Sequence, residues 1–219
     1  MGRVRSHPPP REETLGEAPT VTQAARASWR TDLPVTVMPE VTLRELRIDD
    51  GPSLLAHLSV EEVSRFISPP PTTIAGYEQF IARCHQDRTS GQGACFGIVP
   101  SGAEHAVGIF QLRSLDASFH TAEWGFAMGS AYWGSGLFLQ CATRVLDFAF
   151  DVVGVLRLEA RAAVVNGRGN GALRKTGAVQ EGVLRRSFKR GNQSLDQVLW
   201  SILSEDWLLQ RGPQAAPVH

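Results

Sequence analysis

Residues 123–137 read EWGFAMGSAYWGSGL, which combines a strand-like run, a glycine-rich turn and the start of an apolar helix. Gly134 and Gly136 let backbone N–H groups converge on one point, and the first turn of the helix adds unpaired donors and a partial positive charge. These features predict a cradle for an anionic group such as a pyrophosphate. The alternative is that the two glycines only turn the chain.

Two other phosphate-binding loops are disfavoured by the surrounding residues. A Walker A loop requires G-x-x-x-x-G-K-[ST], and the sequence contains no such string. A dinucleotide fingerprint requires glycine or alanine three places after Gly136, where Leu139 stands. Nucleotide hydrolysis and a nicotinamide site are therefore not expected.

The patterns on both sides of this turn predict one α+β domain in which helices flank a mixed, mostly antiparallel sheet. Apolar alternation and turn residues predict strands at residues 41–48, 94–99, 106–112, 119–128, 156–162, 183–188 and 197–203. Helical spacing and caps predict helices at residues 53–58, from Thr72 or Thr73 through 81, at 137–150 and at 171–175.

Composition limits the class of protein and its partners. The 22 basic and 22 acidic side chains balance, so neither a nucleic acid nor a membrane is an expected partner. Three cysteines without C-x-x-C spacing fit neither a disulfide framework nor a metal site, and no apolar window is long enough for a membrane span. We expect a cytoplasmic protein, monomeric or homodimeric, without a metal.

The chain is expected to divide into a domain and two tails. Residues 1–36 contain a run of three prolines and few large apolar side chains, which predicts a flexible tail. The domain is expected at residues 37–209, followed by a second flexible tail at 210–219.

Several ordered motifs, taken together, resemble the Gcn5-related N-acetyltransferases, in particular the RimJ and RimL type of ribosomal-protein alanine acetyltransferase. They are LREL at 43–46, EWGF at 123–126, YWGSG at 132–136, LDFAF at 146–150, RLEA at 157–160, NGRGNGALRKTG at 166–177 and EGVLR at 181–185. The similarity covers residues 41–203. It implies that acetyl-coenzyme A binds in a cleft between two splayed strands of the sheet.

The resemblance also implies which residues hold the cofactor. The pyrophosphate would lie on the backbone of Trp133, Gly134, Ser135, Gly136 and Leu137. Pantetheine would pair with Phe126, Ala127 and Met128, and Asn166 and Asn170 would hold pantetheine or substrate. Acetyl passes directly to the amine in this family, so no nucleophilic cysteine is required.

Two residues depart from the family pattern. Gly169 stands where relatives carry a serine thought to protonate the departing thiolate, which leaves Ser187, Tyr132 or a water for that role. Ala131 stands where many relatives carry Arg or Gln, which removes one expected phosphate contact.

Glu123 is the predicted catalytic base. A thioester is attacked by a neutral amine, and most amines are protonated at pH 7, so some group must accept a proton. Period two places Glu123 on one face of its strand with Thr121, Gly125 and Ala127, where small neighbours leave room for a ligand. The resemblance places a base at this position. The alternative is a solvent-facing glutamate at a sheet edge.

The acceptor is expected to be a primary amine, either a protein N-terminus or a small molecule. Phe66 and Ile67 are the candidate acceptor contacts. Three other sets are assigned no catalytic or binding role: Trp124 as core, His85 and His120 as surface or packed histidines, and Arg185, Arg186, Lys189 and Arg190 as a solvated edge. The competing function is a non-catalytic module that binds acyl-coenzyme A.

Overall fold

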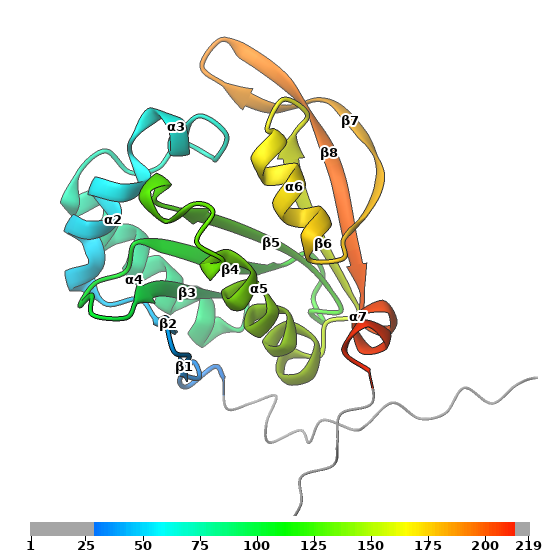
Figure 1. The fold of residues 1–219 in the computed structure, drawn as a ribbon, viewed down its shortest axis with the longest axis horizontal. Helices are drawn as coiled ribbons and strands as arrows, with labels where there is room; N and C mark the ends of the chain where they lie inside the picture. The colour runs from blue at the N-terminus through cyan, green and yellow to red at the C-terminus, as the bar shows by residue number, and fades with distance from the viewer. Residues whose placement is uncertain (1–28, 213–219) are drawn as a thin grey trace, which may run out of the picture.

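The computed structural model describes residues 29–212, which fold around one eight-stranded sheet in the order β1-β2-β3-β4-β5-β6-β8-β7 (Figure 1). The strands are β1 Thr36–Val37, β2 Val41–Glu45, β3 Gly93–Pro100, β4 Gly108–Ser114, β5 Thr121–Met128, β6 Arg157–Ala163, β7 Val179–Arg190 and β8 Gln193–Leu203. Neighbouring strands are antiparallel except β5 and β6, which run parallel. The predicted mixed, mostly antiparallel sheet is confirmed.

Helices cover both faces of this sheet. They are α2 Gly51–Leu58, α3 Glu61–Ser64, α4 Ile74–Ser90, α5 Leu137–Asp147, α6 Gly167–Lys175 and α7 Ser204–Arg211, with a π-helical turn at Phe148–Val153. Thr73 caps α4 by accepting a hydrogen bond from the Gly76 N–H at 3.0 Å, one of the two predicted caps. None of the helices within residues 29–212 is both long and apolar enough to cross a membrane.

Alternation along the strands separates two cores. Cys95 packs on one face with residues of α2 and α4, such as Leu54 and Ile81, whereas its neighbour Phe96 packs on the other face with residues of α5, such as Leu146. Successive strand side chains point to opposite faces, so one sheet supports both clusters. The stacked rings of Phe110 and Trp124 lie in the larger cluster, 6.1 Å apart.

The parallel pairing between β5 and β6 is short, and the two strands separate where it ends. Only Thr121–Glu123 of β5 pair with residues of β6, namely 157–159. Both strands continue beyond this point, to Met128 and Ala163, without pairing with each other. The sheet therefore splits in its middle, as the expected cleft between splayed strands requires.

The predicted domain boundaries were wrong at both ends. Trp29 and Leu33 are buried in the larger core, where the Trp29 ring makes edge contacts with Phe119 and Phe148, so the folded part begins before residue 36. At the other end, α7 runs through Arg211, whose guanidinium pairs with Asp147 and Asp151. The rest of the two predicted tails, residues 1–28 and 213–219, lies outside the described residues.

Candidate active site

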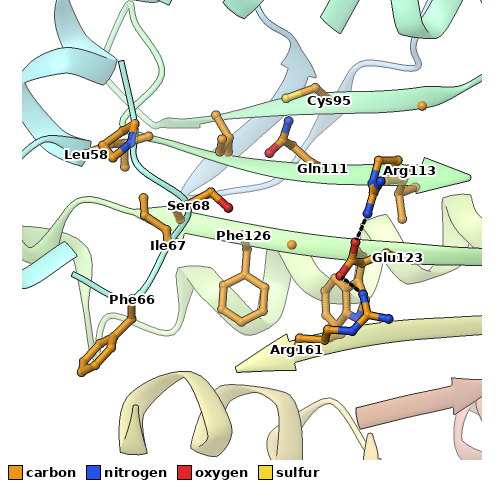
Figure 2. A pocket seen from close by; sticks show the side chains of 18 of the residues that line it. Leu58, Phe66, Ile67, Ser68, Cys95, Gln111, Arg113, Glu123, Phe126 and Arg161 are labelled. Atoms are coloured by element: carbon orange, nitrogen blue, oxygen red, sulfur yellow. Dashed lines mark hydrogen bonds and ion pairs between the residues drawn. The ribbon is translucent and has the colours of Figure 1, made fainter. Parts of the chain in front are cut away.

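A cavity of about 840 Å³ lies where β5 and β6 diverge (Figure 2). Its walls come from β3, β4, β5, β6, α4, α6, the β7–β8 hairpin and the loop at residues 66–71. The volume is in the range of a small-molecule site. One end of the cavity reaches the gap between the parted strands, and the other reaches the sheet face under α4.

The end in the gap is lined by residues of the two parted strands and of α6. They are Trp124, Phe126 and Ala127 of β5, Ala160 and Ala162 of β6, and Asn166, Gly169 and Leu173. Of the predicted cofactor contacts, Phe126, Ala127 and Asn166 line this end of the cavity. Trp124 is 2% exposed and packs in the core as predicted, although it also borders the cavity.

The two asparagines of the expected cofactor set have different surroundings. Asn166 lines the cavity and caps α6, because its Oδ1 accepts a hydrogen bond from the Gly169 N–H at 2.9 Å. Asn170 is buried and does not line the cavity. Its amide donates to the Ala163 and Asn166 carbonyls and accepts from Trp200 Nε1, each at 2.9 Å. Asn170 thus holds α6 against β6 and β8.

Gly169 has a structural reason to be glycine. A Cβ at this position would lie 2.4 Å from Nδ2 of Asn166, closer than real Cβ contacts. A side chain at residue 169 would therefore require the Asn166 amide to shift from its present position.

The glycine turn between β5 and α5 has the geometry of an open cradle. Gly134 and Gly136 have φ of +78° and +88°, which favour glycine, and an added Cβ at either would meet no atom within 4 Å. Trp133 is fixed beside them because its Nε1 donates to the Met128 carbonyl at 2.9 Å. Residues 133–137 and Met128 do not line the cavity.

An arginine that the sequence analysis did not single out connects this turn to α6. The Arg168 guanidinium lies over the Trp133 ring, 4.1 Å from its centroid. Arg168 belongs to the first turn of α6, next to the cavity residues Asn166 and Gly169. Its side chain therefore places a positive charge beside the glycine turn.

Glu123 lies at the split of the sheet between two guanidiniums. One carboxylate oxygen accepts a hydrogen bond from Arg113 of β4, and the other accepts one from Arg161 of β6 at 2.5 Å (Figure 2). All three side chains line the cavity. The predicted strand face is confirmed, because Ala127 packs toward α2 and α4 whereas Trp124 packs toward α5.

The Glu123 cluster continues as a ladder of alternating charges. Arg161 also pairs with Glu159 at 3.2 Å, Glu159 pairs with Arg157 at 3.0 Å, and Arg157 holds Glu181 of β7 through two hydrogen bonds at 2.8 and 2.6 Å. The alternating charges of RLEAR at 157–161 are a sequence signal for this ladder. The pairing of Arg113 with Glu123 has no such signal, because it depends on the register between β4 and β5.

Two cysteines line the cavity, but neither has the surroundings of a nucleophile. Cys84 and Cys95 are both buried there. The neighbouring Cys84 thiol and burial raise the pKa of Cys95 well above its ordinary value, which disfavours the reactive thiolate. The third cysteine, Cys141, is buried in α5, and burial raises its pKa to about 12. These environments agree with chemistry that uses no acyl-enzyme.

Both predicted acceptor contacts line the cavity. The Phe66 ring points away from the row of Gln111, Arg113 and Glu123 (Figure 2). Arg190, which was expected on a solvated edge, instead donates hydrogen bonds to the Ser64 and Ile67 carbonyls. That expectation was wrong for Arg190.

Ser187 and Tyr132 were the two candidate side chains for the proton donor. Ser187 lines the cavity and hydrogen-bonds the Leu184 carbonyl and Gln197 Oε1, at 3.0 and 2.9 Å. Tyr132 packs edge-on against His57 and lies outside the cavity lining. Of these two side chains, only Ser187 lines the cavity that also contains Glu123. His85 hydrogen-bonds the Leu46 carbonyl at 2.8 Å, in keeping with a packed histidine.

A sheet that splits at a parallel strand pair, beside a glycine turn that enters a helix, defines an acyltransferase of the GNAT type. The family model described as "Acetyltransferase (GNAT) domain" matches residues 40–179. The chain belongs to this family.

Individual relatives agree with this assignment. The chain is 23% identical over 168 residues to the uncharacterized N-acetyltransferase p20 of Bacillus licheniformis, covering 76% of this chain and 94% of p20. Its fold is similar to that of the ribosomal-protein-S5-alanine acetyltransferase from Vibrio fischeri, with a TM-score of 0.72, 16% identity and coverage of 80% of this chain and 99% of the other. The fold is also similar to that of Mycobacterium smegmatis RimJ in complex with CoA-disulfide, with a TM-score of 0.71 and 19% identity. This similarity covers 78% of this chain and 88% of the other.

Proposed function

We propose that this protein transfers the acetyl group of acetyl-coenzyme A directly to a primary amine. The observation that carries the proposal is the continuous cavity that joins the gap between β5 and β6 to the face that holds Glu123. An acyl-pantetheine arm entering through the gap would bring its thioester to that face, and an amine could approach it from under α4.

The surroundings of the gap fit this ligand. The glycine turn offers backbone donors and open space at the N-terminus of α5, which suits a pyrophosphate. Arg168, held over Trp133, would supply a cation that Ala131 does not. Beyond Glu123, β5 stays paired with β4 but not with β6, so its edge that faces β6 would pair with the pantetheine amides at Phe126, Ala127 and Met128.

In this proposal Glu123 accepts the proton of the amine. Bound acetyl-coenzyme A supplies a thioester carbonyl that a neutral amine can attack. Each Glu123 oxygen accepts one hydrogen bond from an arginine and keeps a further lone pair that can accept the amine proton. The Arg113 side of the carboxylate is the more open one, because the Arg113 side chain is 67% exposed whereas that of Arg161 is 30% exposed. The departing thiolate would take a proton from Ser187 or a water, since Gly169 has none to give.

A second function is favoured by one observation. A carboxylate held by two arginines also suits a module that binds acyl-coenzyme A without turnover, because both of its oxygens already accept hydrogen bonds from within the protein. Two measurements made side by side distinguish the enzyme from the sensor. Calorimetry with acetyl-coenzyme A is run beside coenzyme A release in the presence of a broad panel of amines. The enzyme predicts binding and release, whereas binding without release across the panel would support the sensor.

A further inference from the structure

We infer that the β7–β8 hairpin closes the acceptor end of the cavity like a strap and limits the acceptor to a small amine. Arg190 attaches the hairpin to residues 61–67, which comprise α3 and the residues just after it and are called the α3 segment. This inference rests on the proposed function. The acceptor chamber is defined here as the part of the cavity lined by Phe66, Ile67, Phe80, Gln111, Gly125 and Phe188.

The fastening is a set of hydrogen bonds between parts of the chain that are far apart in sequence. Arg190 donates to the Ser64 carbonyl, to the Ile67 carbonyl at 3.2 Å and to Ser64 Oγ at 3.4 Å. A guanidinium can hold several acceptors at once because its donors form a rigid fork. Figure 1 shows the hairpin extending beyond the sheet, with its tip bent back toward α3. The hairpin and the α3 segment thus form one wall.

A bulge in β7 bends the strand before it reaches the tip of the hairpin. The register between β7 and β8 shifts between Leu184 and Phe188, Arg186 has φ of +52°, and its N–H donates to Asp196 Oδ1 at 2.7 Å. Such bulges bend a strand and redirect its side chains, often beside a site. Here the residues at and after the bulge, Ser187 and Phe188, line the cavity.

The opposite side of the chamber is also held. Ser130, just after β5, donates through Oγ to Glu62 of α3 at 3.0 Å. The loop that follows α3 contains Pro69, Pro70 and Pro71, all of which line the cavity, and proline rings restrict the backbone of this roof. The α3 segment is therefore attached to the turn after β5 on one side and to the hairpin on the other.

These attachments would exclude large acceptors from the acceptor chamber. The whole cavity measures about 840 Å³, and the acyl-pantetheine arm would share that space with the acceptor. A protein N-terminus must continue out of the chamber as an extended chain, which would require the Arg190 contacts to break. A small primary amine fits without that cost, so the structure assigns the acceptor to this class.

The test uses two bisubstrate conjugates with the same reacting group. In one, coenzyme A is joined through an acetyl bridge to the amine of alanine amide. In the other, it is joined in the same way to the N-terminus of a ten-residue peptide that begins with alanine. Calorimetry on the wild-type protein should give at least about tenfold tighter binding of the short conjugate.

Substitution at residue 190 should reduce this preference. Arg190→Met, with Arg190→Gln as a second variant, should bring the two affinities to within about threefold, because the strap no longer has to be broken. Lys189→Met, on the same hairpin tip and exposed, should keep the wild-type ratio. Melting curves show that each variant is folded.

Three outcomes would overturn the inference. Equal affinity of both conjugates for the wild-type protein would show that the chamber admits a peptide. An unchanged ratio in both folded Arg190 variants would show that Arg190 does not close it. Failure of the wild-type protein to bind either conjugate or coenzyme A would instead reject the proposed function, and the inference with it.

Discussion

Glu123 combines two requirements that compete with each other. Its carboxylate must be accessible to the proton of the amine, yet it is held by hydrogen bonds from Arg113 and Arg161. Each arginine takes one acceptor position on an oxygen that the amine must approach. Because Arg113 is the more exposed partner, an incoming amine can compete with it more readily than with Arg161.

Replacing Glu123 with glutamine should preserve acetyl-coenzyme A affinity and lower kcat by roughly 10²–10⁴, the range typical of a lost general base. Glutamine keeps the shape of the side chain but cannot take a proton. The defect should shrink as pH rises toward the pKa of the acceptor amine, because more amine is then already neutral. The measurement is a pH–rate profile of coenzyme A release.

Glu181→Gln is the matched control for this profile, because Glu181 belongs to the same charge ladder but does not line the cavity. Its kcat should stay near that of the wild type. A Glu123→Gln variant with full activity at pH 7 would rule out the base role. A uniform loss at every pH, expressed mainly in KM, would instead assign Glu123 to amine binding.

The two glycines of the turn give a second prediction at this scale. Gly134→Val or Gly136→Val should weaken acetyl-coenzyme A binding by at least about tenfold, since valine disfavours positive φ and would fill the open cradle. Gly102→Val is the control. Gly102 has a φ of +81°, also meets open space, and lies in the turn after β3, away from the cradle. Calorimetry that shows unchanged affinity in both folded loop variants would refute the phosphate assignment.

At the level of elements, regular alternation was predictable and local irregularity was not. The strands β2 to β8 and the helices α2, α4 and α5 follow apolar patterns that the sequence displays. The start of α6 at Gly167 was missed, because glycines at 167, 169 and 171 have low helix propensity and the Asn166 cap outweighs them. The β7 bulge was also missed, since it depends on Asp196, ten residues away from Arg186.

The link between β6 and β7 predicts a pH dependence of stability. Hydrogen bonds from Arg157 and Ser201 lower the pKa of Glu181 to about 2, from 4.5. A depressed carboxyl pKa contributes stability that is present above pH 4.5 and is lost as pH falls toward 2. The difference in free energy of unfolding between wild type and Glu181→Gln should therefore be constant from pH 7 to about pH 5 and should vanish near pH 2.

Urea unfolding at several pH values measures this difference. Ser114→Ala is a suitable comparison, because Ser114 bonds only a backbone carbonyl, that of Asp116, and should show no such pH dependence. If the difference between wild type and Glu181→Gln did not change between pH 5 and pH 2, the Arg157–Glu181 pair would not be the source of the stability.

At the level of the whole molecule, the folded part is larger than composition indicated. The segment before β1 is rich in charges and prolines, and this hid two buried side chains, Trp29 and Leu33. Only the tertiary structure reveals that Trp29 completes the core between Phe119 and Phe148. The candidate site was more predictable than this boundary, because its glycines and Glu123 lie in one continuous stretch. Arg113, Arg161 and Arg190 were not assigned to it because they come from other elements.

Trp29→Ala should destabilise the protein by about 3–5 kcal/mol, the usual cost of removing a buried tryptophan. The Trp29 side chain is 3% exposed, so its loss would leave a cavity in the larger core. Val35→Ala, in the same segment but 62% exposed, should have little effect on stability. Thermal melts measure both variants. A melting temperature unchanged by Trp29→Ala would show that this segment does not belong to the folded core.

The most direct test of the account is a crystal structure of the protein with coenzyme A bound. We expect the pyrophosphate on the backbone amides of residues 133–137, beside Arg168, and the pantetheine arm between β5 and β6. The thiol should emerge at the cavity face that holds Glu123, under the roof closed by Arg190. Coenzyme A bound away from the gap between β5 and β6, or with its thiol far from Glu123, would contradict the account.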